Sequence, residues 1–345
     1  MRAPDRTTTL VGLTRTGGAV NDVATNATLR NAGLDAVRVV GITAVVVGHS
    51  WNVDEVGRWV YPWHVPLFFF LTGYLFKGDR PFHIELRART RSLAYPYIFW
   101  LLTLGLLYAV GLARAARLGP DSAEMVLWGG SAAYRPFTTF WFFSVLFFTS
   151  LLARVLWRLP RVLRWLCALI GMVLGFLFGD QLAATPLSIG SALPCLFFIV
   201  AGAELRAVRP LLIRDTLWGT TCLVLAATMI GLRVAPALNV KGGEYGTPLS
   251  ALLALVTCAG MVLLGEALFA RASPRFSQGV TTLAVPGLIV VLLHPVVLWV
   301  LDVPDVASPW HFAAVLVLPW IAGLVAVRGH FPQFVTGIAP ARRSK

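Results

Sequence analysis

Long apolar stretches recur along almost the whole chain, and they restrict its possible folds more than any other feature. A helix of about 20 apolar residues is long enough to cross a bilayer. Only 13% of the 345 residues are charged, about half the fraction that is usual in soluble domains. We therefore predict an all-α, polytopic membrane helical bundle of about ten transmembrane helices. The predicted spans are 34–53, 59–76, 95–113, 138–156, 165–180, 187–205, 216–235, 249–270, 280–301 and 311–327.

The basic residues predict how this bundle is oriented. Lys and Arg concentrate in cytoplasmic loops of membrane proteins, and a cytoplasmic N-terminus places most of the 29 basic residues on the inner side. An even number of spans then makes both termini cytoplasmic in a multi-pass protein of the cell membrane. The basic residues that this orientation leaves outside are Arg58, Arg114, Arg117, Arg135, Arg233 and Lys241.

Three regions are expected along the chain. Residues 1–29 lack the apolar core of a signal peptide and are predicted to be a disordered cytoplasmic tail. Residues 30–328 form the transmembrane domain, and residues 329–345 form a basic cytoplasmic tail. The longest outer loop, at about 114–137, is expected to fold back over the outer mouth of the bundle.

Charge and cysteine content exclude two other classes of partner. A net charge of +13 would suit nucleic acid, but the basic residues lie at helix ends on one side, so we expect membrane lipids and no nucleic acid. The cysteines lie inside apolar segments without the close spacing of metal ligands, and no metal site is predicted. They are Cys167, Cys195, Cys222 and Cys258.

Two ionisable residues stand within the first predicted span. Arg38 and His49 are eleven positions apart, which places them within about 20° of each other on a helix and about 16 Å apart along its axis. Ionisable side chains inside a membrane are costly, so both are candidates for function. The alternatives are that Arg38 reaches the inner headgroups and that His49 is an interfacial residue.

Several segments resemble the membrane-bound acyltransferase family 3. The first span resembles the family's first helix, which carries an arginine, ten residues and a histidine, and the second is similar to its His-Met-Pro-Leu-Phe-Phe-Phe pattern followed by Ser-Gly-Tyr. Three later segments resemble a basic stretch before Pro-Tyr, a Trp-Phe-Leu helix and a His-Pro segment. The five segments are RNAGLDAVRVVGITAVVVGHS (30–50), WHVPLFFFLTGYLF (63–76), RTRSLAYPY (89–97), FWFFSVLFF (140–148) and LLHPVV (292–297).

This resemblance implies an integral membrane O-acyltransferase, with 30–328 as the acyltransferase domain. Such an enzyme moves an acyl group, commonly acetyl, from cytoplasmic acyl-CoA to a hydroxyl of a sugar, glycolipid or cell-envelope glycan, with no tightly bound cofactor. His49 would act as general base or acyl carrier, and Arg38 would assist it while holding the donor. Arg89 and Arg91 would bind CoA phosphates. The family's two arginines three positions apart are replaced here by alternating arginines at 87, 89 and 91.

Other polar residues have two interpretations each. His64 and Trp141 either contact the acceptor or belong to the aromatic belt and the packing. His294 precedes Pro295, which frees a backbone carbonyl that the imidazole could satisfy. Glu204 and Glu266 are expected to pair with nearby Arg206 and Arg271. A transporter for a polar or anionic solute remains the alternative function. Transporters often have prolines or glycines that interrupt helices at corresponding positions in two halves of the chain, but no such correspondence is found for Pro66, Pro194, Pro286 and Pro295. A membrane scaffold would leave Arg38 and His49 unexplained.

Overall fold

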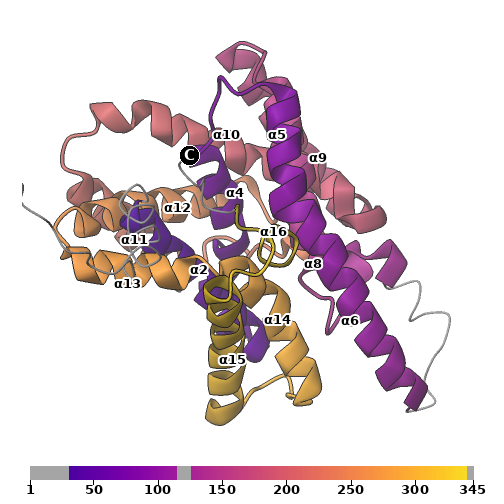
Figure 1. Ribbon diagram of the computed structural model, residues 1–345. Coiled ribbons are helices and arrows are strands. Elements are labelled where there is room, and N and C mark those ends of the chain that lie inside the picture. The colour runs from indigo at the N-terminus through magenta and orange to yellow at the C-terminus, as the bar shows by residue number, and fades with distance from the viewer. Residues whose placement is uncertain (1–30, 115–125, 340–345) are drawn as a thin grey trace, which may run out of the picture.

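The computed structural model describes residues 31–114 and 126–339, which fold into a bundle of helices (Figure 1). Within these ranges the only strand-like pairings are two isolated β-bridges, between Trp51 and Val306 and between Asn239 and Glu244. The all-α prediction is therefore confirmed. The tail predicted over 1–29 lies outside the described residues.

The helices follow one another through short connections. Their bounds are α2 (Ala32–Ser50), α3 (Asp54–Val60), α4 (His64–Tyr74), α5 (Phe82–Arg89), α6 (Tyr95–Arg114), α8 (Phe140–Leu156), α9 (Arg161–Ala183), α10 (Ala192–Val208), α11 (Asp215–Gly231), α12 (Pro248–Phe269), α13 (Pro274–Ala284), α14 (Gly287–Val300), α15 (Pro309–Arg328) and α16 (Gln333–Thr336). A π-helical turn, Thr90–Ala94, joins α5 to α6. The result is one long helix along the side of the bundle (Figure 1).

Six helical segments in the described ranges are long and apolar enough to cross a membrane. The count rises to seven if α13 and α14, which meet at an angle of 53°, form one broken span. The chain is thus a multi-pass membrane protein, but the predicted count of ten is not confirmed. The difference arises because several apolar stretches fold as shorter helices with turns beside them; α4 has 11 residues and α14 has 14.

Helix α2 carries both ionisable residues and lies inside the bundle. The Asn31 side chain caps its start by accepting from the Leu34 amide, 3.2 Å away, which satisfies one of the free amides of a helix N-terminus. The helix packs against α4, α12, α13 and α14. Asp35 and Ser50 on α2 are therefore fully buried, whereas 28% of the Arg38 side chain stays exposed.

The far end of α2 is joined to the connection between α14 and α15. The Asn52 amide donates to the Asp305 carbonyl at 2.8 Å, and the Ala307 amide donates to the Ser50 carbonyl at 2.9 Å. The Trp51 indole also donates to the Ala307 carbonyl, at 2.7 Å. These bonds fix the end of α2 that carries His49 against the segment that follows α14.

Helices α4 and α10 pack in direct backbone contact. A Cβ atom on Gly202 would lie 2.0 Å from the Phe70 carbonyl oxygen, and one on Gly73 would lie 1.9 Å from the Ile199 carbonyl oxygen. Only glycine fits at both positions, and small residues at helix contacts allow this approach in membrane proteins. The contact places α4, and with it His64, close to the centre of the bundle.

Two ion pairs differ from the predicted ones. Glu204 pairs with Arg161 on α9 instead of Arg206, and Glu266 pairs with Arg209, whose Nε lies 3.1 Å from Oε2, instead of Arg271. Residues two positions apart on a helix point in different directions, so Glu204 and Arg206 do not face each other. Both carboxylates instead bind arginines of other segments.

The end of the chain is folded back onto α6. The Trp100 indole donates to the Val335 carbonyl of α16 at 2.9 Å, and Gly337 follows with a positive φ of 72°. Part of the segment predicted as a basic tail, up to residue 339, is therefore packed against the bundle. Its last residues lie outside the described ranges.

Candidate functional site

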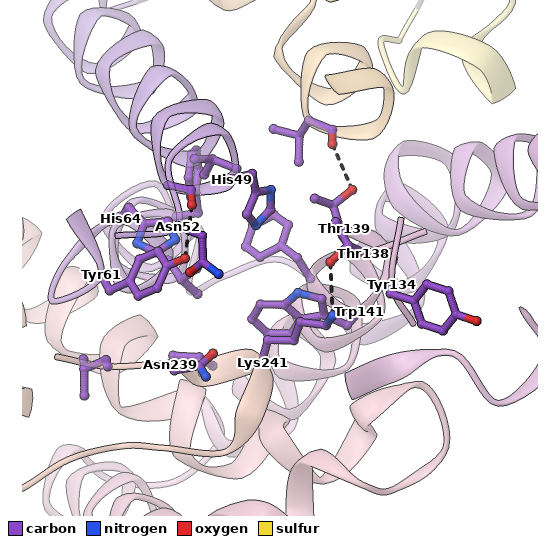
Figure 2. A pocket seen from close by; sticks show the side chains of 18 of the residues that line it. His49, Asn52, Tyr61, His64, Tyr134, Thr138, Thr139, Trp141, Asn239 and Lys241 are labelled. Carbon is purple, nitrogen blue, oxygen red and sulfur yellow. Dashed lines mark hydrogen bonds between the residues drawn. The ribbon is translucent and has the colours of Figure 1, made fainter. Parts of the chain in front are cut away.

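A cavity of about 480 Å³ lies at the end of α2 that carries His49 (Figure 2). Its walls come from α2, α4 and α8 and from the connections at 134–139 and 238–241. Aromatic rings form much of the lining, together with His49 and His64. The lining includes Tyr61, Phe68, Tyr134, Trp141 and Phe142 among the aromatic residues, and Asn52, Arg135, Thr138, Thr139, Asn239, Lys241 and Asp305 among the polar ones.

His49 forms a direct hydrogen bond with a second histidine, 245 positions later in the chain. Its Nδ1 lies 2.7 Å from Nε2 of His294 on α14, and the two rings are stacked with centroids 5.0 Å apart. His294 is fully buried. The sequence offered His294 as a lesser candidate, and its pairing with His49 was not foreseen.

The protons in this pair can be assigned from the backbone. His294 Nδ1 lies 3.1 Å from the Val290 carbonyl oxygen, which can only accept, so Nδ1 carries the proton. In a neutral ring Nε2 is then an acceptor, and His49 Nδ1 donates to it. The second nitrogen of His49, Nε2, keeps its lone pair and forms no hydrogen bond within the part of the chain that the structure describes.

Pro295 affects the same turn of α14. Its missing N–H leaves the Val291 carbonyl without its helical donor, and the Thr139 hydroxyl donates to that oxygen at 2.9 Å. This turn of α14 is thus joined to the start of α8, and the His294 imidazole contacts the preceding carbonyl, that of Val290. This arrangement holds His294 in place from two sides.

Arg135 supports the His49 end of α2. Its guanidinium donates to the His49 carbonyl at 3.1 Å and to the Val303 carbonyl at 2.7 Å. Carbonyls at the end of a helix lack intrahelical donors, so Arg135 satisfies one at the end of α2 and joins it to Val303, three residues beyond the end of α14. Arg135 was identified from the sequence only as an outer basic residue.

His64 and Trp141, the predicted acceptor contacts, both line the cavity. His64 is buried, and its Nδ1 donates to the Val60 carbonyl, 3.0 Å away. Trp141 is 5% exposed and lies at the start of α8. Their location fits contact with a bound molecule, and both also pack against the protein.

Lys241 reaches the cavity from the connection before α12. Its ammonium donates to the Ala133 carbonyl and to the Thr138 hydroxyl, the latter at 3.1 Å (Figure 2). Burial lowers its pKa from 10.5 to about 8. The one sequence signal for this residue is a lysine on the side of the bundle where basic residues are rare.

The predicted donor-binding arginines lie away from this cavity, which none of them lines in the described structure. Arg38 forms an ion pair with the fully buried Asp35, one turn earlier in α2. Arg89 donates to Glu85 at 2.7 Å, and Arg91 is exposed. The predicted roles of these arginines therefore remain predictions.

Glu85 is the centre of a basic cluster that the sequence did not reveal. This carboxylate is 2% exposed and lies within 4 Å of Arg80 and Arg154 as well as Arg89. Arg154 is itself buried and also donates to the carbonyls of Lys77 and Gly78. One carboxylate thus faces three guanidinium groups, so the cluster carries excess positive charge.

Metal-ligating side chains do not gather at the cavity or elsewhere in residues 31–114 and 126–339, where three or more His, Cys, Asp or Glu side chains never form a possible metal site. The two-histidine pair, His64 and Lys241 are the nitrogen bases among the lining and adjoining residues of the cavity.

Comparison with known proteins identifies a family. A family model described as an acyltransferase domain matches residues 31–329, and this range includes His49, His294 and all the lining residues of the cavity. No curated protein and no solved structure matched the chain.

Proposed function

Since the chain belongs to the acyltransferase family whose model matches residues 31–329, we propose that it transfers an acyl group, most simply acetyl, from acyl-CoA to a sugar or glycolipid hydroxyl. The observation that carries this proposal is the His49–His294 pair at the wall of the cavity. It leaves His49 Nε2 as an acceptor without a partner in the described structure. A sugar hydroxyl is a weak nucleophile at neutral pH and needs such a base.

The transfer begins when an acceptor hydroxyl lies within hydrogen-bonding reach of His49 Nε2. This nitrogen takes the hydroxyl proton while the oxygen attacks the thioester carbonyl and forms the new C–O bond. The C–S bond then breaks, and the CoA sulfur leaves with the proton that His49 holds. No proton is gained or lost over the cycle, so His49 returns to its starting tautomer.

His294 acts in this scheme as a positioning residue. Its Nε2 accepts from His49 Nδ1, which keeps the lone pair of His49 on the other nitrogen and stabilises the imidazolium that forms during the reaction. A second group that fixes the tautomer of a catalytic histidine is a general feature of acyl-transfer enzymes. In this protein the second group is another imidazole, fixed by the Val290 carbonyl.

The donor is proposed to enter from the cytoplasmic side, at the end of the bundle that carries Arg38 and Arg89. CoA is polyanionic, and guanidinium groups bind phosphates with two parallel hydrogen bonds. The basic cluster around Glu85 adds Arg80 and Arg154 to this end. Arg38 and His49 are about 16 Å apart along α2, a distance that the pantetheine arm of CoA would have to cover.

The acceptor is proposed to bind in the cavity from the outer side. Its aromatic walls offer flat apolar surfaces to a sugar ring, while His64, Asn52 and Asn239 supply hydrogen-bonding groups. Trp141 is the largest of these rings and lies at the start of α8. The proposal therefore places the chemistry near the outer end of the membrane domain.

The decisive experiment replaces His49 with alanine in the full-length protein. We expect acyl transfer from radiolabelled acetyl-CoA to membrane glycans and glycolipids to fall by about 10²–10⁴-fold, the usual contribution of a general base, with membrane insertion and acetyl-CoA binding retained. His83→Ala, an exposed histidine at the far end, is the matched control. Near-normal product formation by His49→Ala would exclude this role, and transport of a solute without any acylated product would favour the transporter.

A further inference from the structure

The cavity is lined by a half-buried cation, Lys241, that has no carboxylate partner in the described structure. Arg38, Arg89, Arg154 and Arg209 all lie within 4 Å of an Asp or Glu side chain, as expected for charges removed from water. Within residues 31–114 and 126–339 the Lys241 ammonium, in contrast, donates to a backbone carbonyl and a hydroxyl and forms no ion pair. Its charge is solvated in part but not neutralised.

The hydrogen bonds of Lys241 leave room for one more partner. An ammonium has three donors, and the Ala133 carbonyl and the Thr138 hydroxyl take two of them. These two bonds hold Nζ at the cavity wall (Figure 2). The third donor is available to a molecule in the cavity.

Arg135 adds a second positive charge to the lining of the cavity. It also lines the cavity, and its two described hydrogen bonds go to neutral carbonyls. The one carboxylate among the lining residues is Asp305, which is exposed and forms no ion pair with either cation in the described ranges. The lining therefore carries two cations and one carboxylate, an excess of positive charge.

We propose that the acceptor is anionic. Lys241 binds the carboxylate or phosphate of the acceptor, while the acceptor's reacting hydroxyl lies at His49. This inference rests on the proposed acyl transfer and specifies its substrate class. A sugar acid and a sugar phosphate, free or lipid-linked, share the required chemistry. The anion would take the third donor of Lys241 and add a charge-assisted hydrogen bond, which is stronger than a neutral one.

Binding to the purified full-length protein in detergent tests this proposal without any donor. The probes are methyl glucuronide, glucose 6-phosphate and, as the neutral reference, methyl glucoside, each titrated by calorimetry. We expect at least one anion to bind tenfold or more tightly than the neutral glycoside, as a charge-assisted hydrogen bond commonly provides. The anion that binds more tightly distinguishes a sugar acid from a sugar phosphate.

Variants then assign the preference to Lys241. Lys241→Gln should remove the tenfold preference, whereas Lys241→Arg, which keeps the charge, should retain most of it. Arg233→Gln is the matched control, because Arg233 is also a basic residue of the predicted outer side, with a side chain 69% exposed, and does not line the cavity. This control should bind all three probes like the unmodified protein.

Three results would each overturn the proposal. The first is equal binding of the neutral and anionic probes, and the second is no binding of either anion. The third is a loss in Lys241→Gln that affects all three probes equally, as a purely structural role would. The proposed reaction is judged separately, because His49→Ala should still bind the anion. Anion binding that depends on Lys241 without any acylated product would reject the reaction and leave the anion site standing.

Discussion

Replacing His294 tests how the two-histidine pair works. In His294→Leu the hydrogen bond between His49 Nδ1 and His294 Nε2, 2.7 Å long, is lost, while a buried side chain of similar size remains. The Val290 carbonyl still accepts its α-helical bond, so we expect the protein to fold. The neutral His49 ring can then carry its proton on Nε2, and in that tautomer Nε2 has no lone pair with which to take the hydroxyl proton.

The magnitude follows from the charge that forms on His49 during the reaction. A hydrogen bond to a charged group contributes about 1.5–3 kcal/mol, and about 1.4 kcal/mol corresponds to a tenfold change in rate. His294→Leu should therefore lower kcat about 10- to 150-fold. The KM values for donor and acceptor should change little, because His294 is fully buried and is not among the lining residues of the cavity.

The conservative variant His294→Gln provides the control. Its amide oxygen can accept from His49 Nδ1 near the position of the missing imidazole nitrogen, so we expect it to recover most of the kcat lost in His294→Leu. The assay is initial-rate acyl transfer by purified protein at varied donor and acceptor concentrations. A kcat in His294→Leu equal to that of the unmodified protein would refute the positioning role, and so would equal losses in both variants.

Three further predictions concern other parts of the structure. Binding of the anionic probe, measured by calorimetry, should weaken as pH rises from 7 to 9.5. Burial lowers the pKa of Lys241 to about 8, so its ammonium is charged below that pH and neutral above it. Lys241→Arg should show no such loss, and a parallel decline in that variant would contradict the assignment. Acetyl-CoA binding, measured by equilibrium dialysis, should weaken as the salt concentration rises. It should also fall strongly in the double variant Arg38→Lys, Arg89→Lys, since an ammonium cannot reproduce a forked contact. Unchanged affinity would reject this donor site. Gly202→Ala should destabilise the protein by about 1–3 kcal/mol or more, because the new Cβ would lie 2.0 Å from a backbone oxygen of α4. The measurement is the Tm in detergent, and the control is Gly231→Ala, where a Cβ would have nothing within 4 Å. Equal Tm values for the two variants would disprove the close packing.

Hydrophobicity in the sequence determined the class of fold and several local features. The apolar stretches predicted an all-helical membrane protein because a segment in lipid must satisfy its own backbone hydrogen bonds. Helical periodicity put Arg38 and His49 on one face of α2, since that relation depends on a single helix. The motifs around His49 and His64 indicated the acyltransferase family, which the match over residues 31–329 confirms.

Only the tertiary structure decided which helices meet and which side chains share the cavity. His49 and His294 are 245 positions apart, and Lys241 reaches Thr138 across 103 positions. Membrane helices are apolar on most faces, so hydrophobicity does not specify which faces pack together; small residues such as Gly202 and a few polar contacts do. The sequence therefore singled out His49 as a candidate base, whereas packing between distant helices brought His294 to it and Lys241 to the same cavity.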